Sequence, residues 1–303
     1  AARNPTKIAS IIINSPEKLK LPNIVPIPKQ LARAKVLEVG IVGTISHNIG
    51  KRCLQLTMPD VKKGADSNIS ALFWEILSML KHYKDQNLQQ PAILFIQMDN
   101  GSENKNRWMF GFILMLIYWK WFLEVNIYFL QPGHTHEDVD QMFSTLSLWL
   151  DTNSVGSIPS LISNLPKAWN KSPSYRPQIK CFPAFMNWSQ WLAPHLKDFS
   201  GHNRSYAFIF RLQSNGRPGM KMKTLAQSKL WQGTPDDPTQ WIDLFTTIPT
   251  GYPSLSMPDL IALDSIADID KFENWITTEE HTWLTSLKER RKLHPPIEIP
   301  QNW

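Results

Sequence analysis

The chain has 303 residues, of which 42% are hydrophobic and 19% are charged, with a formal net charge of +6 at pH 7 and a pI near 9.2. These values exclude a disordered or fibrous chain and describe a folded globular protein with ample core-forming residues. The positive charge suits an anionic partner such as nucleic acid without requiring one. The two cysteines, Cys53 and Cys181, lie too far apart to indicate a disulfide framework or a cysteine-based zinc module, so a reducing, intracellular compartment is expected.

The sequence starts at Ala1 without an initiator methionine or an apolar signal core, so we expect a fragment of a longer chain. A first strand is predicted over residues 8–13, where an apolar, β-branched run is ended by an Asn-Ser-Pro turn sequence. Residues 36–46 and 52–58 have strand composition and flank the turn sequence "HNIGK". These two runs predict an antiparallel hairpin.

A helix is predicted over residues 66–83, because apolar residues repeat there at helical spacing behind an Asp-Ser-Asn cap sequence. Residues 92–98 form a short apolar run typical of a strand buried on both faces. Ser102 is then expected to begin a helix that includes the apolar segment 107–123. The uninterrupted part of this segment is shorter than the roughly 20 residues that cross a bilayer and is broken by Lys120, which favours a helix buried in the protein over a membrane span.

Residues 124–130 alternate like a strand, a Gln-Pro-Gly turn follows, and residues 139–150 return to helical spacing. Three leading strands followed by alternating helices and strands is the order of elements in a ribonuclease-H-like domain. We therefore predict an α/β fold in which residues 1–151 form a ribonuclease-H-like core, with a mixed five-stranded sheet flanked by helices.

Residues 152–303 differ in character and are predicted to form a mixed α+β C-terminal extension packed on the core. Their proline-rich first part, residues 152–200, reads as irregular helices and loops. Residues 205–225 predict a hairpin with its turn at Asn215-Gly216 and a basic return strand. A final helix over residues 274–293 ends in a basic run that is either a solvated helix end, a phosphate contact or a nuclear targeting signal.

Acidic residues fall near the places where a ribonuclease-H-like domain holds two divalent metals, which are the first strand, the end of the fourth strand and the helix after the fifth. Asp99 directly follows the predicted strand 92–98, at the crevice where open α/β sheets bind ligands. Asp140 lies on the predicted helix after the fifth strand. Two such carboxylates can hold Mg²⁺ or Mn²⁺ for phosphoryl transfer, although Asp99 alone also reads as an ordinary Asp-Asn-Gly turn.

The segment around Asp140 is rich in ionisable residues, some of which a helix start explains. Thr135 can cap this helix, with Asp138 in the usual third position and Glu137 near the positive end of the helix dipole. Helix capping does not explain Asp140 or the His-x-His pair, His134 and His136, which therefore remain functional candidates. These histidines suit metal binding or proton transfer, and we assign His136, Asp99 and Asp140 as catalytic candidates and His134 and Asp138 as further metal ligands.

The first-strand position departs from this pattern, because Asn14 stands where an acid is expected and the next carboxylate is Glu17. An amide oxygen can bind magnesium but brings no charge, so metal affinity should fall unless Glu17 compensates. Glu17 is therefore included among the candidate metal ligands.

Basic residues near these acids and on the predicted hairpin are candidates for contact with a nucleic-acid backbone. They are Lys105, Arg107, Arg217, Lys221 and Lys223.

Four blocks of the sequence stand out together, which are "IIINSPEKLKLP", "DSN", "QMDNGSENKNRWMFGF" and "FLQPGHTHEDVDQMFSTLSLWL". They resemble an uncharacterised eukaryotic family of domains of unknown function, DUF7869, and the last two blocks are the most specific. The resemblance extends over most of the chain, including a less distinctive region from Phe208 to Trp231.

Members of this family often look transposon-derived and are similar in layout to ribonuclease-H-like transposases and integrases. The resemblance thus implies a DNA partner, a nuclear location and a site built on Asp99-Asn100, residues 103–107 and residues 133–140. Family members tend to read Asp-Gly-x-Asp where this chain reads Asn14-Ser15-Pro16-Glu17, so this copy is expected to have weakened or lost cleavage activity.

Three functions follow as alternatives. The first is a transposase- or integrase-like nuclease that depends on Mg²⁺ or Mn²⁺. The second is a catalytically inactive, domesticated domain that binds nucleic acid or protein. The third is a mononuclear metal hydrolase built on His134, His136, Asp99 and Asp138 or Asp140, whose mixed ligands suit zinc or iron better than magnesium.

Overall fold

The computed structural model describes residues 8–16, 18–59, 61, 64–130, 138–182, 184–224, 230–234, 240–255 and 271–289. Its strands are β1 (Ile8–Asn14), β2 (Leu19–Leu21), β3 (Leu37–Val39), β4 (Ile41–Ser46), β5 (Lys51–Thr57), β6 (Ile93–Met98), β7 (Glu124–Phe129), β8 (Gln178–Phe182), β9 (Ala207–Leu212) and β10 (Pro218–Lys223). The α-helices are α1 (Ala65–Asp85), α2 (Arg107–Tyr118), α3 (Asp138–Leu150), α4 (Ile158–Asn164), α5 (Trp188–Leu192) and α6 (Thr278–Glu289). Short 3₁₀ turns are η1 (Lys29–Leu31), η2 (His47–Ile49), η3 (Leu165–Trp169), η4 (Pro173–Tyr175), η5 (Ala193–His195) and η6 (His202–Arg204).

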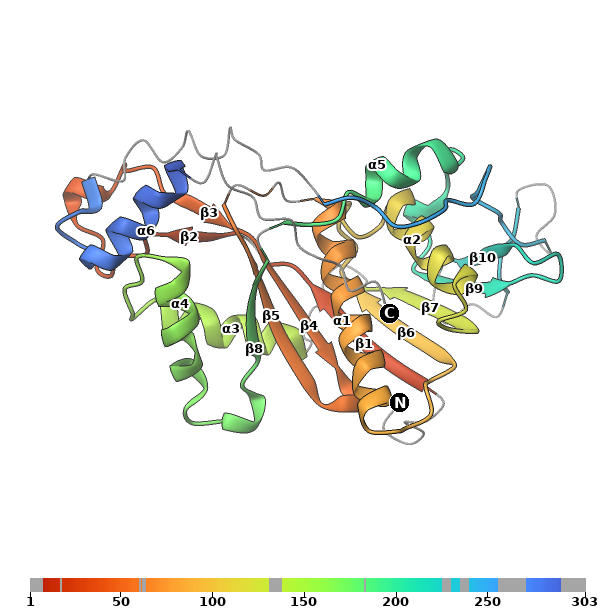
Figure 1. Ribbon diagram of the computed structural model, residues 1–303, viewed down its shortest axis with the longest axis horizontal. Coiled ribbons are helices and arrows are strands. Elements are labelled where there is room, and N and C mark those ends of the chain that lie inside the picture. Colours follow the sequence, from red (N-terminus) through yellow and green to blue (C-terminus); the bar gives the residue numbers. More distant parts are fainter. Residues whose placement is uncertain are drawn as a thin grey trace.

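One mixed sheet of eight strands organises the molecule, in the order β10-β9-β7-β6-β1-β4-β5-β8. Strands β1, β6 and β7 are parallel, and β4 runs antiparallel to both β1 and β5. The hairpin β9–β10 extends the sheet beyond β7 and closes its right-hand end in Figure 1, while β8 adds a parallel strand beside β5. Strands β2 and β3 form a separate antiparallel pair near α6.

The prediction of an α/β fold is confirmed, but the predicted number of five strands is wrong, because three strands after residue 151 join the same sheet. Strand β8 was missed since it is short and lies between Pro177 and Pro183, where apolar periodicity is interrupted. The hairpin at 205–225 was predicted correctly, with Gly216 in the left-handed conformation at φ 76°. Its attachment to β7 was not foreseen, because strand pairing over that sequence distance leaves no local signal.

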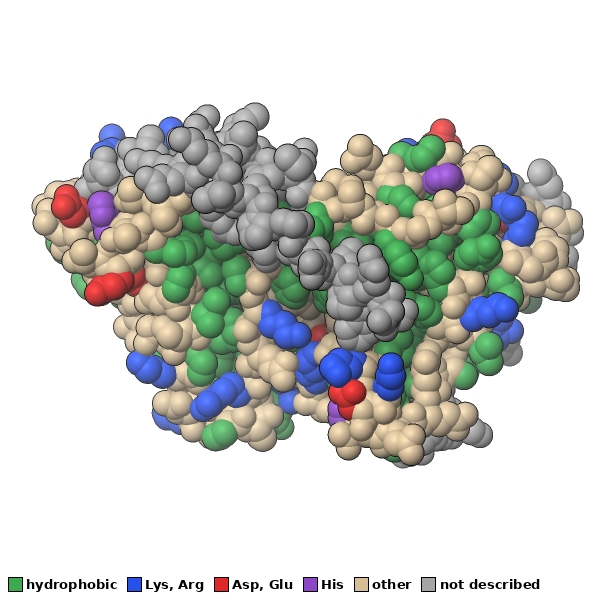
Figure 2. All heavy atoms as spheres, viewed as in Figure 1, with side chains coloured by type: hydrophobic (Ala, Val, Ile, Leu, Met, Phe, Trp, Pro, Cys, Tyr) green, Lys and Arg blue, Asp and Glu red, His purple; other side chains and the backbone are tan. Residues whose placement is uncertain are grey.

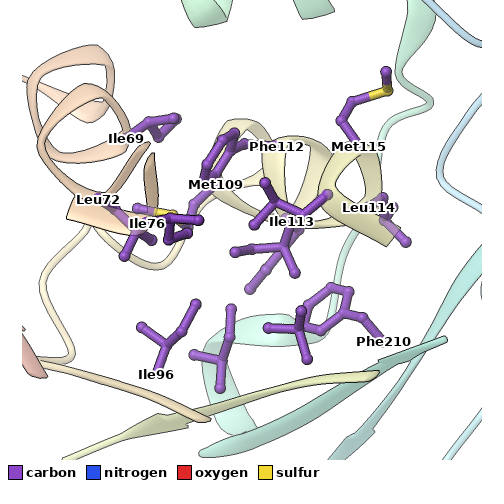
Figure 3. Packing of buried hydrophobic residues seen from close by; sticks show 14 of the residues in the cluster. Ile69, Leu72, Ile76, Ile96, Met109, Phe112, Ile113, Leu114, Met115 and Phe210 are labelled. Atoms are coloured by element: carbon purple, nitrogen blue, oxygen red, sulfur yellow. The ribbon is translucent and has the colours of Figure 1, made fainter. Parts of the chain in front are cut away.

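Two hydrophobic layers cover the two faces of the sheet. Helices α1 and α2 pack on one face and lie in front of the sheet in Figure 1. In Figure 3, Phe112 of α2 lies on the side of α1, near Ile69, whereas Ile113 projects toward the strands that carry Ile96 and Phe210. Residues Met109 to Ile117 of α2 are all buried, as expected of a helix that is apolar on all sides. None of the described helices is long and apolar enough to cross a membrane.

Helix α2 begins five residues later than predicted. Residues 102–106 form turns, and the side chain of Asn106 caps the helix by accepting hydrogen bonds from the backbone N–H groups of Trp108 and Met109, both at 3.0 Å. A side-chain acceptor placed to satisfy the first free N–H groups of a helix fixes where that helix starts. The polar segment 99–106 is therefore free to form the loop at the end of β6.

Helix α3 packs on the opposite face, mainly against β4. Val139, Met142, Phe143, Leu146 and Leu150 form its buried side. Gly43 of β4 lets the helix lie close, because a Cβ atom at that position would be only 2.6 Å from Phe143 Cζ. The other side of α3 stays exposed, so polar residues on it are available at the surface.

Candidate functional site

The end of β1 and the first turn of α3 meet through Asn14 and Asp140. Asn14 Nδ2 donates a hydrogen bond to Asp140 Oδ1 at 3.1 Å, across 126 positions of sequence. Asn14 Oδ1 accepts one from the backbone N–H of Ser15 at 2.7 Å. The amide is thus held with its nitrogen toward the carboxylate and its oxygen toward its own chain. A shallow groove beside this contact is lined by residues 14–16 and by the α3 residues Asp140, Phe143, Ser144, Ser147 and Leu148.

Asp99 lies on the neighbouring strand at the same end of the sheet. The parallel register of β1 and β6 ends at the pair Ile13 and Met98, which are followed directly by Asn14 and Asp99. Paired strands lie about 4.8 Å apart, so these two residues occupy adjacent positions at one edge of the sheet. Two of the three predicted positions, Asn14 and Asp140, are in contact, and Asp99 lies at the strand end next to them.

A chain of buried amides fixes the orientation of Asp99. Asn104 Nδ2 donates to Asp99 Oδ1 at 2.5 Å, and the Gly101 backbone N–H donates to the same oxygen at 3.1 Å. Asn104 is itself oriented by Asn68 of α1, whose Nδ2 donates to Asn104 Oδ1 at 2.8 Å. Both asparagines are buried. Within the described part of the chain, Asp99 Oδ2 has no hydrogen-bond partner, which leaves it available to a ligand.

Lys105 lies beneath the loop that carries Asp99 and is 6% exposed. Its Nζ donates to Asn100 Oδ1 at 2.8 Å and to the Asn203 carbonyl at 3.0 Å. The ammonium group also lies 4.6 Å from the ring centroid of Tyr206 and 5.1 Å from that of Phe129. Burial disfavours the charged form and lowers the pKa of Lys105 to about 8.

His202 shares this buried region with Lys105. Burial lowers the pKa of the His202 imidazole, and the positive charge of Lys105 lowers it further. Its Nδ1 is buried without a hydrogen-bond partner among the described residues, and its ring stacks on Phe199. Burial and the neighbouring Lys105 thus both disfavour protonation of His202.

The other predicted nucleic-acid contacts lie away from this edge or are already engaged. Arg107 pairs with Asp198 and covers the ring of Trp108. Arg217 pairs with Asp243 and donates to the Phe245 carbonyl, which ties the hairpin to a later segment. Lys221 and Lys223 lie over the rings of Trp241 and Trp231 at 5.3 and 4.1 Å. On the face shown in Figure 2, the Lys and Arg side chains are scattered, with several in the lower half and others at the upper left and on the right, and they do not form one stripe.

Three of the predicted metal or catalytic residues, Glu17, His134 and His136, lie outside the residues that the structure describes. Asp138 is exposed in the first turn of α3. Among the residues that are described, no group of three or more His, Cys, Asp or Glu side chains is placed to hold a metal ion. The described acids at this edge are Asp99 and Asp140, and Asn14 at the end of β1 contacts Asp140.

Sequence reasoning missed the supporting residues of this edge. Asn68 was read as part of a helix cap and Asn104 as part of a polar run, yet both orient Asp99. Lys105 was expected at the surface, and its burial depends on the segment around Asn203, almost 100 residues later. Asn104 and Lys105 share one local signal, which is a polar side chain in the segment between the strongly apolar elements β6 and α2.

A family model described as "Domain of unknown function (DUF7869)" matches residues 29–228, which is more than half of the chain. The chain belongs to this family. No curated protein and no solved structure matches it. The matched range of DUF7869 includes Asp99, Asn104 and Asp140 but begins after Asn14.

Proposed function

We propose that this DUF7869 protein is a transposase- or integrase-like protein with a ribonuclease-H-like core, acting on the phosphodiester backbone of DNA in the nucleus. Five strands support the core, in the order β5-β4-β1-β6-β7, with β4 antiparallel to its two neighbours. The helices between the later strands, α1 and α2, lie on one face, and α3 lies on the other. The observation that carries the proposal is the contact between Asn14 and Asp140, which joins the end of β1 to the helix after β7.

The residues at this edge fit a divalent metal in part. Asp99 and Asp140 are carboxylates, the ligands that Mg²⁺ prefers, and magnesium is often bound by only one or two carboxylates together with substrate phosphate. When bound there, Mg²⁺ or Mn²⁺ would supply positive charge for phosphoryl transfer. Asn14 fits less well, since its oxygen is engaged by Ser15 and its N–H group faces Asp140.

The protein's own groups have separable roles in this proposal. Asp99 keeps Oδ2 toward the ligand because Asn104 and Gly101 hold Oδ1. Asp140 brings the second carboxylate from the first turn of α3. Lys221 and Lys223 of β10, each over a tryptophan ring, would contact the nucleic acid further from the reacting phosphate.

A second candidate is a domain that binds nucleic acid or protein without catalysis. The Asn14 amide favours it, because a neutral side chain with an engaged oxygen lowers the negative charge available to a metal. The third alternative, a zinc or iron hydrolase, depends on His134 and His136, for which no described contact gives support.

A nicking assay on supercoiled plasmid DNA with Mg²⁺ or Mn²⁺ tests the first candidate. The parent protein is expected to nick, and Asp99→Ala and Asp140→Ala are expected to abolish nicking because each removes a carboxylate ligand. Asp85→Ala serves as the matched control, since Asp85 is an exposed acid paired with Lys81 at the end of α1. Nicking by Asp99→Ala at the parental rate would show that this edge is not the active site.

The variant Asn14→Asp separates the first two candidates. Restoring a carboxylate between Asp99 and Asp140 is expected to raise metal affinity and nicking by about tenfold or more if the site is a weakened nuclease. A protein that binds DNA with strong salt dependence, but nicks neither as the parent nor as Asn14→Asp, would be a binding domain. Absence of DNA binding at low salt would count against both candidates.

A further inference from the structure

A second cavity opens on the other side of α3 from the Asn14–Asp140 groove. It has a volume of about 250 Å³, and its walls come from β5, α3, η3 and η4. Its lining combines two cations, aromatic side chains and polar groups, including Arg52, Asp138, Gln141, Trp169, Lys171 and Tyr175. The volume is below the roughly 300–1,000 Å³ of sites for drug-sized ligands, so the cavity suits one small planar unit and excludes a duplex.

Arg52 is the central charged group of this cavity. It shares the face of β5 with Leu54 and Leu56, which directs its side chain toward the α3 layer. Its guanidinium carbon lies 4.6 Å from the ring centroid of Tyr175. Among the described residues, neither Arg52 nor Lys171 forms an ion pair. The cavity thus holds two positive charges that no described acid pairs with.

We propose that this cavity binds one unpaired nucleotide of a nucleic-acid strand. The base would stack against the Arg52–Tyr175 pair, since bases stack on tyrosine rings and on the plane of arginine. The phosphate would lie by Lys171, and Gln141 and Asp138 offer a donor and acceptors to the edge of the base. An anion without a base would leave the aromatic wall unused, and an apolar ligand would leave both cations unpaired.

The position of the cavity relates it to the proposed site. On α3, Asp138 and Gln141 face the cavity, whereas Asp140 and Ser144 line the groove beside Asn14. Successive helix positions are about 100° apart, so the two depressions flank one exposed ridge of α3. A single strand crossing this ridge would place one nucleotide in the cavity and a neighbouring phosphate beside Asp140. This inference rests on the proposed function, but its test needs no catalysis.

The test compares two fluorescent single strands of about 12 nucleotides, one with normal bases and one with abasic residues throughout. Removal of the bases keeps every phosphate, so the difference in affinity measures base recognition. The parent protein, residues 1–303, is expected to bind the normal strand about five- to a hundredfold more tightly than the abasic strand. Tyr175→Leu is expected to lose most of that preference.

Matched variants control for nonspecific effects. Tyr252→Leu removes a tyrosine of similar exposure, 52% against 54% for Tyr175, that lies outside the cavity, and it should keep the base preference. Arg52→Gln is expected to weaken binding of both strands and to reduce the steepness of the salt dependence, whereas Lys84→Gln at the end of α1 should change neither. Circular dichroism checks that each variant is folded, and Lys171→Gln replaces Arg52→Gln if the latter is not.

Equal binding of normal and abasic strands by the parent would overturn the proposal, as would an unchanged base preference in Tyr175→Leu. If inorganic phosphate competes as well as a deoxynucleoside monophosphate, the cavity is only an anion site and the proposal fails. The outcome is independent of nicking. Base preference without nicking would support the nucleotide cavity and contradict the proposed activity. Nicking without base preference would support the activity and contradict the cavity.

Discussion

The face of the sheet under α1 and α2 is covered by buried apolar side chains. The layer on the other face, formed by α3, has polar side chains exposed at the surface. Met109 to Ile117 of α2 are all buried, but α3 buries only one side and exposes Asp138 and Gln141. The buried carboxylate of Glu75 on the first face is engaged inside the fold by Thr44, Ser46 and Lys51. The α1/α2 face is thus mainly a packed apolar layer, whereas α3 leaves polar side chains exposed at the surface.

The largest effect that tests this difference is expected from Phe112→Ala in α2. Phe112 is fully buried and lies within 4.8 Å of the Trp188 ring, centroid to centroid, so the truncation leaves a cavity that the surrounding core cannot close. We expect a loss of about 3–5 kcal/mol in the free energy of unfolding. Leu148→Ala on the exposed side of α3 is the control, and urea unfolding should show a change within about 0.5 kcal/mol.

A smaller but sharper comparison uses two acids, one on each face. Glu75 is 1% exposed, accepts hydrogen bonds from Thr44 and Ser46 and pairs with Lys51 at 3.5 Å. Glu75→Ala removes one partner of a buried pair and is expected to cost about 3 kcal/mol. Asp140→Ala should cost about 1–2 kcal/mol, because it removes an acid from the first turn of a helix and the hydrogen bond that Asn14 donates to it. Similar losses in thermal unfolding for both variants would contradict the division between the faces.

Local sequence patterns predicted the helices and strands that form these two faces, but they did not predict the contacts between distant segments. Helical spacing over residues 66–83 and the apolar run at 92–98 correspond to α1 and β6, because burial of one face or of a whole strand leaves a local pattern. The meeting of Asn14 and Asp140 followed from the order of elements. Strand β8 and the pairing of β9 with β7 depend on partners far along the chain, so local periodicity could not reveal them.

The candidate site shows the same limit at the level of single residues. The residue types of Asp99 and Asp140 marked them as candidates, whereas the roles of Asn68 and Asn104 depend on side-chain geometry between α1 and the loop before α2. The burial of Lys105 was unexpected, because a lysine in a polar run is normally solvated. Tertiary packing of the segment near Asn203 over this lysine overrides that expectation.

The smallest predicted change in the free energy of unfolding concerns Lys105, which is buried beneath the loop that carries Asp99. Its pKa is about 8 in the folded protein, against about 10.4 in an unfolded chain. Between these values the unfolded state binds more protons, so the free energy of unfolding should rise as pH rises, by about 1–2 kcal/mol from pH 8 to 9.5. Urea unfolding at the two pH values, compared with Lys105→Met, isolates this contribution because methionine does not titrate. If the difference in free energy of unfolding between parent and variant stays constant with pH, the pKa of Lys105 is ordinary. The edge that holds Asp99 would then be as exposed to water as the outer side of α3.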